Sequence, residues 1–595
     1  MKHLLAILRQ YAEVAVHLII LGVGTSLAHV ASIASDEAFR IQQLTSTWYV
    51  VTTWKPVNGT PFPANFMYGV TDAGIVLIDA PWDTTATRSC LDTIQRRHQR
   101  NVVACVVTHA HDDRTASIPM LRSMGIATWS SRFTDSLCIE RGEARCQYHF
   151  NTDTTIVFGS TPINIKYLGK GHSDDNVVVW LPKDRILFGG CLIKSTENAS
   201  LGNLEHANVG EWRSTAQRLV DSFRIADHVV PGHFAWGGRE LLDHTLALTK
   251  AWLNDNLIVY GYFRGGLQEA KMQSTDGLTD VAFSFIYLRD GQAVFESDEQ
   301  EGVLRELLQK RSAHPGLRVH VSVGGWGGCE TCSDVFSTEA GRRRFVTSLQ
   351  QLIQKYDLDG VDIDWETPVI GGFKNHPAQP ADRDNLTELL RLMRKQFDEQ
   401  VMITIAANSD SVAMEKSYDW AAILPLVDVV SLMTYGLPND RRGHTGHHTA
   451  LYSSEYQRES IDRAIARLRA KGLPLRKFLL GAGFYAFVVR NVEAGSTHGL
   501  GMRGSFLRNC TYDELTRDYT KAQGFETYRD SVARAPYRHN RADSIFITFD
   551  DPESLFEKSR YILKNGLGGC TIWKINGDDA AGSLRRAIKR GLTDD

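Results

Sequence analysis

The chain has 595 residues, of which 43% are hydrophobic and 23% are charged, and its formal net charge is −3. This composition is ordinary for a globular protein and excludes extended disorder, and the lack of a basic excess argues against a nucleic-acid partner. At about 150 residues per domain, the length predicts two to four domains.

Residues 1–34 have the pattern of a secretory signal peptide. Lys2 supplies a positive start, residues 14–23 are apolar except for His17, and small residues follow. We therefore predict cleavage near residues 28–34 and a periplasmic or secreted protein. The alternatives are an uncleaved membrane anchor and a wrongly assigned start. No other stretch approaches the roughly 18 apolar residues that a spanning helix needs, so no membrane contact is expected after cleavage.

The nine cysteines are an odd number, which excludes a complete disulfide framework. An oxidising compartment would allow individual pairs. Two pairs are close enough in sequence to be candidates, Cys329 with Cys332 and Cys138 with Cys146.

Two differently patterned halves follow one another along the chain. Residues 44–250 contain short β-rich runs separated by turns and a few helical stretches, which predicts sheets covered by helices. From residue 257 onward, strands and helices alternate, and eight apolar strands in series predict a (β/α)₈ barrel. These strands are LIVYGYF, VAFSFIYL, RVHVSVGG, GVDIDW, MITIAA, VVSLMTY, FLLGAGFY and GCTIWKI.

Six side chains suited to binding metal follow strands in the first half. Three imidazoles suit one Zn²⁺, and a carboxylate, a thiolate and an imidazole suit a second, with an open position left on each ion. A purely structural zinc site is the alternative, although such sites are usually closed and rich in cysteine. The first set is His109, His111 and His172, and the second is Asp113, Cys191 and His233.

This half resembles the metallo-β-lactamases, specifically the first subclass of class B, with Cys191 as the discriminating residue. The resemblance implies an αββα sandwich over residues 37–252, two zinc ions and hydrolysis of β-lactams. It also implies that Lys194 holds the substrate carboxylate and that Asn203 lies near the developing oxyanion. The chain departs from the family where His206 replaces a usual Asp and where Phe234 replaces a usual small residue.

A row of acidic residues is the strongest signal in the second half. Asp362, Asp364 and Glu366 alternate along one predicted strand and therefore share one face, directed into the barrel. Three carboxyl groups on such a face cannot all ionise cheaply, so a raised pKa on Glu366 suits a general acid. A solvated acidic strand and a divalent-cation site are the alternatives.

The run D-x-x-D-x-D-x-E resembles the signature of glycoside hydrolase family 18, the chitinase family. The resemblance covers residues 255–592. It implies cleavage of β-1,4-linked N-acetylglucosamine polymers by substrate-assisted catalysis, with no cofactor. Glu366 would be the acid, Asp364 and Tyr435 would act on the N-acetyl group, and Asp362 would share a proton with Asp364. Three aromatic residues would contact the sugar: Trp573 as the floor, Trp326 and Tyr262.

The barrel half departs from the family at Gly436, where an Asp is usual after Met-Thr-Tyr. A loop with His444, His447 and His448 suggests either a further metal site or a wall of the cleft. The leading hypothesis is a bifunctional exported hydrolase, acting as a monomer on small β-lactams and on chitin. One alternative is an active β-lactamase carried by a chitin-binding, catalytically weak barrel. Another keeps the zinc pair but assigns a different ester or amide substrate.

Overall fold

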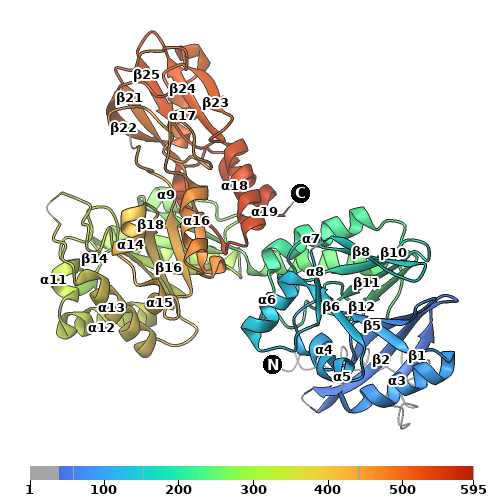
Figure 1. Ribbon diagram of the computed structural model, residues 1–595. Helices are drawn as coiled ribbons and strands as arrows, with labels where there is room; N and C mark the ends of the chain where they lie inside the picture. Colours follow the sequence, from blue (N-terminus) through green and yellow to red (C-terminus); the bar gives the residue numbers. More distant parts are fainter. Residues whose placement is uncertain are drawn as a thin grey trace, which may run out of the picture. The chain divides into compact units, whose positions relative to one another are not determined.

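The computed structural model describes residues 39–593, apart from residues 58, 83, 152, 375, 440 and 441 (Figure 1). The predicted signal peptide lies outside the described residues. Within the described part of the chain, no helix is both long and apolar enough to cross a membrane. The chain divides into two compact units, residues 1–207 with 215–246 and residues 208–214 with 247–595.

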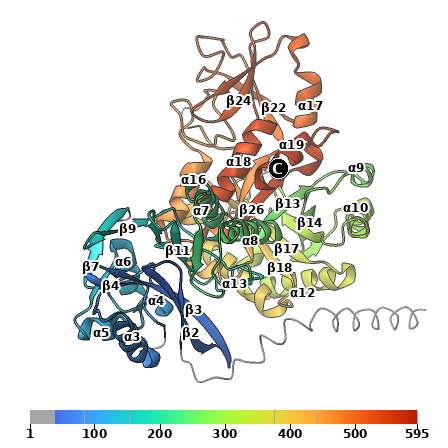
Figure 2. The same ribbon diagram turned by 90° about the vertical axis from the view of Figure 1, so that its right-hand side faces the viewer.

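The first unit contains two sheets. The first sheet has the order β1-β2-β3-β4-β5-β6-β7 and the second has the order β12-β11-β10-β9-β8. The strands of the first sheet are β1 (Phe39–Gln43), β2 (Trp48–Val57), β3 (Thr60–Thr71), β4 (Gly74–Ile78), β5 (Val102–Val106), β6 (Ala127–Ser131) and β7 (Tyr148–Phe150). Those of the second are β8 (Thr154–Phe158), β9 (Thr161–Lys166), β10 (Val178–Leu181), β11 (Ile186–Gly190) and β12 (His228–Pro231). Strands β2 and β3 form a long hairpin, drawn in dark blue (Figure 2).

Both faces of the first sheet are buried, and successive residues of a strand serve opposite faces. Val50 and Val76 pack between the two sheets, against Val179 of β10. Their neighbours Val51 and Leu77 pack on the other face, where the helices lie. Helices α3 (Thr84–His98) and α5 (Ile118–Ser123) contribute to the apolar cluster on that face. The other helices along this half of the chain are α4 (Asp112–Thr115), α6 (Arg132–Arg141), α7 (Val209–Ser222) and α8 (Glu240–Asn256). This is the predicted αββα sandwich.

The second unit is the predicted (β/α)₈ barrel. Eight strands pair in parallel in the order β13-β26-β20-β19-β18-β17-β16-β14, and pairing between β13 and β14 closes the ring. The strands are β13 (Ile258–Phe263), β14 (Asp280–Arg289), β16 (Arg318–Gly324), β17 (Gly360–Asp364), β18 (Met402–Asn408), β19 (Val429–Met433), β20 (Phe478–Gly483) and β26 (Gly569–Trp573). All eight correspond to the apolar runs recognised in the sequence.

Helices surround the barrel strands. They are α9 (Leu267–Met272), α10 (Asp298–Gln309), α11 (Cys332–Phe336), α12 (Glu339–Tyr356), α13 (Asp382–Gln396), α14 (Ser411–Lys416), α15 (Trp420–Ile423), α16 (Ile461–Ala470), α18 (Pro552–Asn565) and α19 (Ser583–Thr593). Their apolar faces join the outward side chains of the strands in one large core, to which β17 contributes Val361 and Ile363. A short strand, β15 (Gln292–Val294), extends β14 as a hairpin.

An antiparallel sheet is inserted between β20 and β26, and the sequence analysis did not predict it. Its order is β22-β21-β25-β24-β23 (Figure 1). The strands are β21 (Tyr485–Arg490), β22 (Ser505–Thr511), β23 (Glu526–Asp530), β24 (Ala535–Asn540) and β25 (Ile545–Thr548), with helix α17 (Tyr512–Asp518) after β22.

The structure decides between the two suggested cysteine pairs. Cys329 and Cys332 are joined by a disulfide, which confirms that pairing. The suggested pairing of Cys138 with Cys146 is wrong, because both are buried free thiols. Cys146 packs into the apolar cluster under the first sheet, and Cys138 lies on the inner side of α6.

Candidate active sites

Three histidines of the first unit converge on one point. His109 and His111 follow β5, and His172 lies in the loop after β9. Their ligand atoms all lie within 4.8 Å of one another, and Nδ1 of His111 is 3.1 Å from Nε2 of His172. Burial lowers the pKa of His109 and of His172 well below the ordinary imidazole value. Both rings are therefore neutral at pH 7, the form that binds metal.

His109 provides the test of whether these residues fit a metal ion. Its Nδ1 lies 3.0 Å from the Thr108 hydroxyl. Its Nε2 is buried, and no group in the described part of the chain hydrogen-bonds to it. A buried ring nitrogen without a partner is costly unless something else occupies that position. The donor set, imidazoles with a nearby thiol, is the one that zinc prefers.

A second group adjoins the first and shares His109 with it. Ligand atoms of His109, Asp113 and Cys191 lie within 4.8 Å of one another. His233 joins them, because its Nε2 is 3.0 Å from Oδ2 of Asp113. All six predicted ligands are thus in one place. They come from loops at the ends of β5, β9, β11 and β12, which buried strands hold in position.

A buried arginine lies among these donors, and the sequence analysis missed it. The guanidinium of Arg114 is 3.0 Å from Asp113, 3.1 Å from the Cys191 sulfur and 3.3 Å from Nε2 of His233. It also donates to the backbone oxygens of Asn65 and Gly232. Burial would raise the pKa of Asp113, but Arg114, His233 and His109 together outweigh that effect and keep the pKa well below its usual range.

Asp79 supports the loop that carries the histidines. It is fully buried and accepts hydrogen bonds from the backbone N–H and the hydroxyl of Thr108, at 2.7 and 2.9 Å. That hydroxyl also contacts Nδ1 of His109, so Asp79 fixes the ring through one intermediate residue. Such outer contacts orient ligands and tune a metal site.

The rim of this site holds the predicted substrate-contacting residues. Lys194 is 8% exposed, and burial lowers its pKa. Its Nζ lies beside Gly202, 3.8 Å from where a Cβ there would stand, so it reaches the loop that bears Asn203. Asn203 is exposed, and its side-chain oxygen accepts from the Glu205 N–H at 3.0 Å. His206 reaches the histidine cluster, with Nδ1 3.1 Å from Nε2 of His111.

Aromatic side chains wall the other side. Phe62, from the β2–β3 hairpin, lies 5.0 Å from the His233 ring and 5.1 Å from the Phe234 ring, between centroids. Trp82 contacts Phe62 edge to face and donates to Asp112. Phe234 has φ +65, a backbone conformation that favours glycine.

In the second unit, β17 directs two carboxyl groups into the barrel. Asp362 is fully buried and accepts three hydroxyl hydrogen bonds. They come from Tyr262 at 3.0 Å, Ser322 at 2.7 Å and Thr404 at 2.5 Å. Tyr262, predicted to contact sugar, is only 2% exposed and serves here as a support for Asp362.

Asp364 and Glu366 have different surroundings. Oδ1 of Asp364 is buried and has no hydrogen-bond partner among the described residues. Burial raises the pKa of Asp364 well above its usual range, and the neighbouring Glu366 and Asp362 raise it further. Burial likewise raises the pKa of Glu366, to about 7. At neutral pH this pair therefore retains protons, as a general acid requires.

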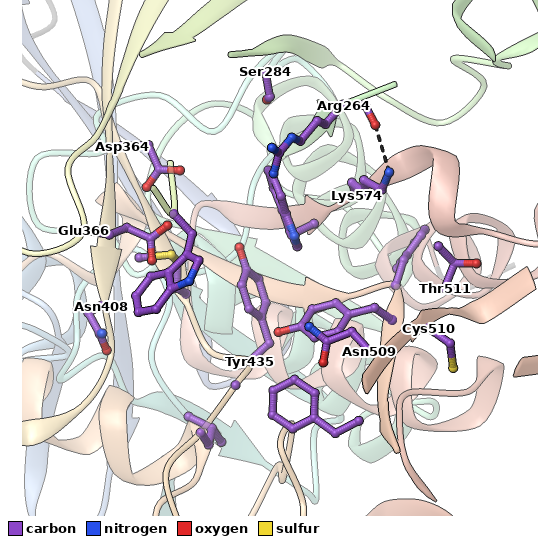
Figure 3. Close-up of a pocket in the computed structure, with 18 of the residues that line it drawn as sticks. Arg264, Ser284, Asp364, Glu366, Asn408, Tyr435, Asn509, Cys510, Thr511 and Lys574 are labelled. Atoms are coloured by element: carbon purple, nitrogen blue, oxygen red, sulfur yellow. Dashed lines mark hydrogen bonds between the residues drawn. The ribbon is translucent and has the colours of Figure 1, made fainter. Parts of the chain in front are cut away.

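Both carboxyl groups open onto a cavity of about 1070 Å³ (Figure 3). Tyr435 also lines it, and Figure 3 shows its ring in the middle of the group. Trp573 forms part of the wall, stacked on Phe285 with centroids 5.5 Å apart. Trp326 lines the cavity as well and is 58% exposed, an open aromatic face of the kind that sugars stack on.

The departure at Gly436 is part of this wall. Its φ is +63, and its N–H points to Nδ1 of His448 at 3.5 Å. His448 is buried and stacks on Phe487, while His447 pairs with Asp530. His448 thus supports the cavity wall, and no cluster of metal-binding side chains is found at this loop among the described residues.

Comparison with known proteins identifies the family of each unit. The family model "Glycosyl hydrolases family 18" matches residues 258–578. A metallo-beta-lactamase type 2 of Elizabethkingia meningoseptica is 38% identical over 213 residues, which cover 36% of this chain and 86% of that protein. The chain belongs to both families. It is therefore a hydrolase with two hydrolytic units, a metallo-β-lactamase unit and a family 18 barrel.

Two further relatives match the family 18 barrel. Chitinase A1 of Niallia circulans is 30% identical over 304 residues, which cover 47% of this chain and 43% of that chitinase. A solved family 18 N-acetylglucosaminidase of Paenibacillus barengoltzii aligns with a TM-score of 0.50 and 30% identity. That alignment covers 57% of this chain and all of the other.

Proposed function

We propose that the chain is an exported, bifunctional enzyme. In this proposal the metallo-β-lactamase unit opens β-lactam rings with two zinc ions, and the family 18 barrel cleaves β-1,4-linked N-acetylglucosamine polymers. The observation that carries it is that one chain holds two complete sets of reactive groups. One set surrounds the partnerless, buried Nε2 of His109, and the other surrounds the protonated Asp364–Glu366 pair. Export rests on residues 1–34, and the monomeric state remains a prediction.

In the first unit, the protein's task is to bind zinc and to orient the lactam. Zinc, when bound, supplies a nucleophile at neutral pH and a Lewis acid for the carbonyl. His109, His111 and His172 would hold one ion, and Asp113, Cys191 and His233 the other. Lys194 places a positive charge at the rim, where it attracts the carboxylate that penicillins and cephalosporins share.

In the barrel, Glu366 would protonate the glycosidic oxygen while the substrate's own N-acetyl oxygen attacks the anomeric carbon. This substrate-assisted route needs no second carboxylate nucleophile. Oδ1 of Asp364, which has no hydrogen-bond partner among the described residues, is available to accept the N-acetyl N–H. The Tyr435 hydroxyl would donate to the N-acetyl oxygen, and Trp573 would support the sugar ring. Asp362, held by three hydroxyls, keeps Asp364 in place.

The alternative of a barrel that only binds chitin draws support from Gly436, which lacks the carboxylate that its relatives have. Against it, the acid with a pKa of about 7 and its partner are both present and open to the cavity. We therefore favour catalysis in both units.

The test applies two perturbations to one preparation. Chelation is expected to abolish hydrolysis of a chromogenic cephalosporin and to leave cleavage of chitotetraose unchanged. Glu366→Gln is expected to abolish cleavage of chitotetraose and to leave hydrolysis of the cephalosporin unchanged. Elemental analysis before and after chelation should follow the loss of zinc. Lactam hydrolysis that survives removal of all metal would refute the first assignment, and full chitotetraose cleavage by Glu366→Gln would refute the second.

A further inference from the structure

The sugar cavity has two positive side chains on its wall that the proposed chemistry does not use. Arg264 follows β13 and Lys574 follows β26, and both line the cavity. In Figure 3 they lie to one side of Tyr435, while Asp364 and Glu366 lie to the other. Neither is needed to cleave a neutral chitin chain, so their presence calls for another explanation.

Arg264 lies close to the aromatic residues that would support a bound sugar. Its guanidinium carbon lies 5.6 Å from the centroid of the Phe285 ring, and Phe285 stacks on Trp573. It is exposed, and in the described part of the chain its guanidinium has neither an ion-pair partner nor a hydrogen-bond acceptor. A guanidinium offers donors in a rigid fork that fits a carboxylate with two hydrogen bonds.

Lys574 adds a second charge beside it. Its Nζ donates to the backbone oxygen of Arg264 at 2.8 Å, which ties the two residues together (Figure 3). That bond engages one of the three ammonium hydrogens, and the carbonyl oxygen that accepts it carries no full charge. The partial burial of Lys574 strengthens its interaction with any anion that enters.

The acidic groups near Lys574 are held by other donors. Glu269 accepts from the N–H of Gly266 at 2.8 Å and from the side chain of Asn576 at 3.3 Å. Glu514 accepts from the N–H of Thr511 at 2.7 Å and lies 3.6 Å from Arg508. Glu514 also lines the cavity, but among the described residues neither carboxylate forms an ion pair with Arg264 or Lys574, so both cations remain available to a ligand.

We propose that this wall is a subsite for a carboxylate carried by a sugar, so that the preferred substrate is an acidic N-acetylhexosamine oligomer. The inference rests on the proposed sugar-cleaving function of the barrel and narrows its substrate class. The carboxylate is either a lactyl ether on O3 of alternate sugars or an oxidised C6. Arg264 would bind it by charge-assisted hydrogen bonds, with Lys574 adding attraction.

The experiment measures binding in the full chain carrying Glu366→Gln, so that oligomers are bound without being cut. Calorimetry compares four tetramers: neutral chitotetraose, a tetramer with free 3-O-lactyl groups, the methyl ester of that tetramer, and a C6-oxidised tetramer. The lactyl acid and its ester have the same shape and differ only in charge. We expect a carboxylated tetramer to bind about tenfold tighter than the uncharged ligands.

The variants then locate the effect. Arg264→Gln should remove most of the difference in Kd between the carboxylated and the uncharged tetramers, and Lys574→Gln should reduce that difference. Arg391→Gln is the matched control, because Arg391 lies on α13, pairs with Glu388 and does not line the cavity. If Arg264→Gln folds poorly, the salt dependence of Kd for the carboxylated tetramers is measured in the protein that carries only Glu366→Gln. A contact between charges weakens as the salt concentration rises.

The outcomes separate this inference from the proposed function. An advantage for the lactyl tetramer or for the C6-oxidised tetramer supports the inference and identifies the position of the carboxylate. Equal Kd values for acid and ester, with no gain for the C6-oxidised tetramer, overturn it. Cleavage of chitotetraose by the unsubstituted enzyme is measured separately, so failure of the proposed chitin activity would show there and not in the binding data.

Discussion

Asp364 and Glu366 lie two residues apart and are both buried, but they have different roles in the proposed reaction. Glu366 would give a proton to the leaving group, and Asp364 would bind the N-acetyl group. Asp362 beneath them receives three hydroxyl donors, which stabilise its charged form. Asp364 receives none at Oδ1 among the described residues. Burial raises the pKa of Asp362 as well, but its three hydroxyl donors oppose that shift, whereas the carboxyl groups that neighbour Asp364 add to the rise of its pKa.

This arrangement predicts a pH dependence for sugar cleavage. Burial raises the pKa of Glu366 to about 7. Because the protonated form is the active one, activity is present below that pH and is lost as the pH rises through it. We expect kcat/KM for chitotetraose to fall about tenfold per unit at pH values well above 7. Rates between about pH 5 and pH 9 test this, and a profile that stays flat to pH 9 would contradict it.

Arg114 makes a second residue-level prediction, about metal binding. Its guanidinium is a cation that contacts Asp113, Cys191 and His233. Arg114→Ala would remove the principal cation beside the buried Asp113 and should lower the unfolding free energy of protein stripped of metal by about 3 to 5 kcal/mol. Zinc would then restore the missing positive charge, so the zinc-induced rise in Tm should be larger in the variant than in the parent.

Arg114→Lys controls for the charge, because it keeps a cation but loses the fork of donors. Calorimetry with and without zinc reads out the effect independently of activity. An equal zinc-induced shift in parent and Arg114→Ala would show that the guanidinium and the metal do not compete for these donors.

At the scale of elements, the β2–β3 hairpin carries an aromatic residue to a site built by other strands. Phe62 contacts His233 and Phe234, which follow strand β12 of the second sheet. The long pairing of β2 with β3, from Trp48 with Gly69 to Val57 with Thr60, positions it. The hairpin thus supplies apolar contact area and no reactive group.

Phe62→Ala should therefore weaken substrate binding more than chemistry. We expect KM for a cephalosporin to rise several-fold and kcat to change little, the pattern of lost uniform binding. Val57→Ala is the control, since Val57 lies on the same hairpin and is 40% exposed. A large fall in kcat with KM unchanged would instead place Phe62 in the reacting geometry.

At the scale of the whole molecule, the parts predicted from sequence were those with a local signal. Barrel strands such as FLLGAG of β20 are apolar runs because both of their faces are buried. The inserted sheet escaped prediction because some of its strands lack such runs, as in ETYRD of β23 and in SFLRNCT of β22, where five residues are exposed. The metal ligands share a recognisable spacing, whereas Arg114 acts only through burial among residues from distant loops, which no local pattern reveals.

The last prediction is that the two catalytic sites act independently, because no residue belongs to both. Four proteins test it: the parent, Cys191→Ser, Glu366→Gln and the double variant. Cys191→Ser should lower kcat/KM for a cephalosporin more than tenfold and reduce bound zinc, because it removes a thiolate ligand. Glu366→Gln should act only on chitotetraose.

In free-energy terms, the double variant should show each loss unchanged, within about 0.5 kcal/mol, because sites that share no partners contribute additively. Melting curves of all four proteins control for misfolding. A loss of sugar cleavage in Cys191→Ser, in a protein that melts like the parent, would show that the metal site influences the barrel and that the two activities are coupled through the chain.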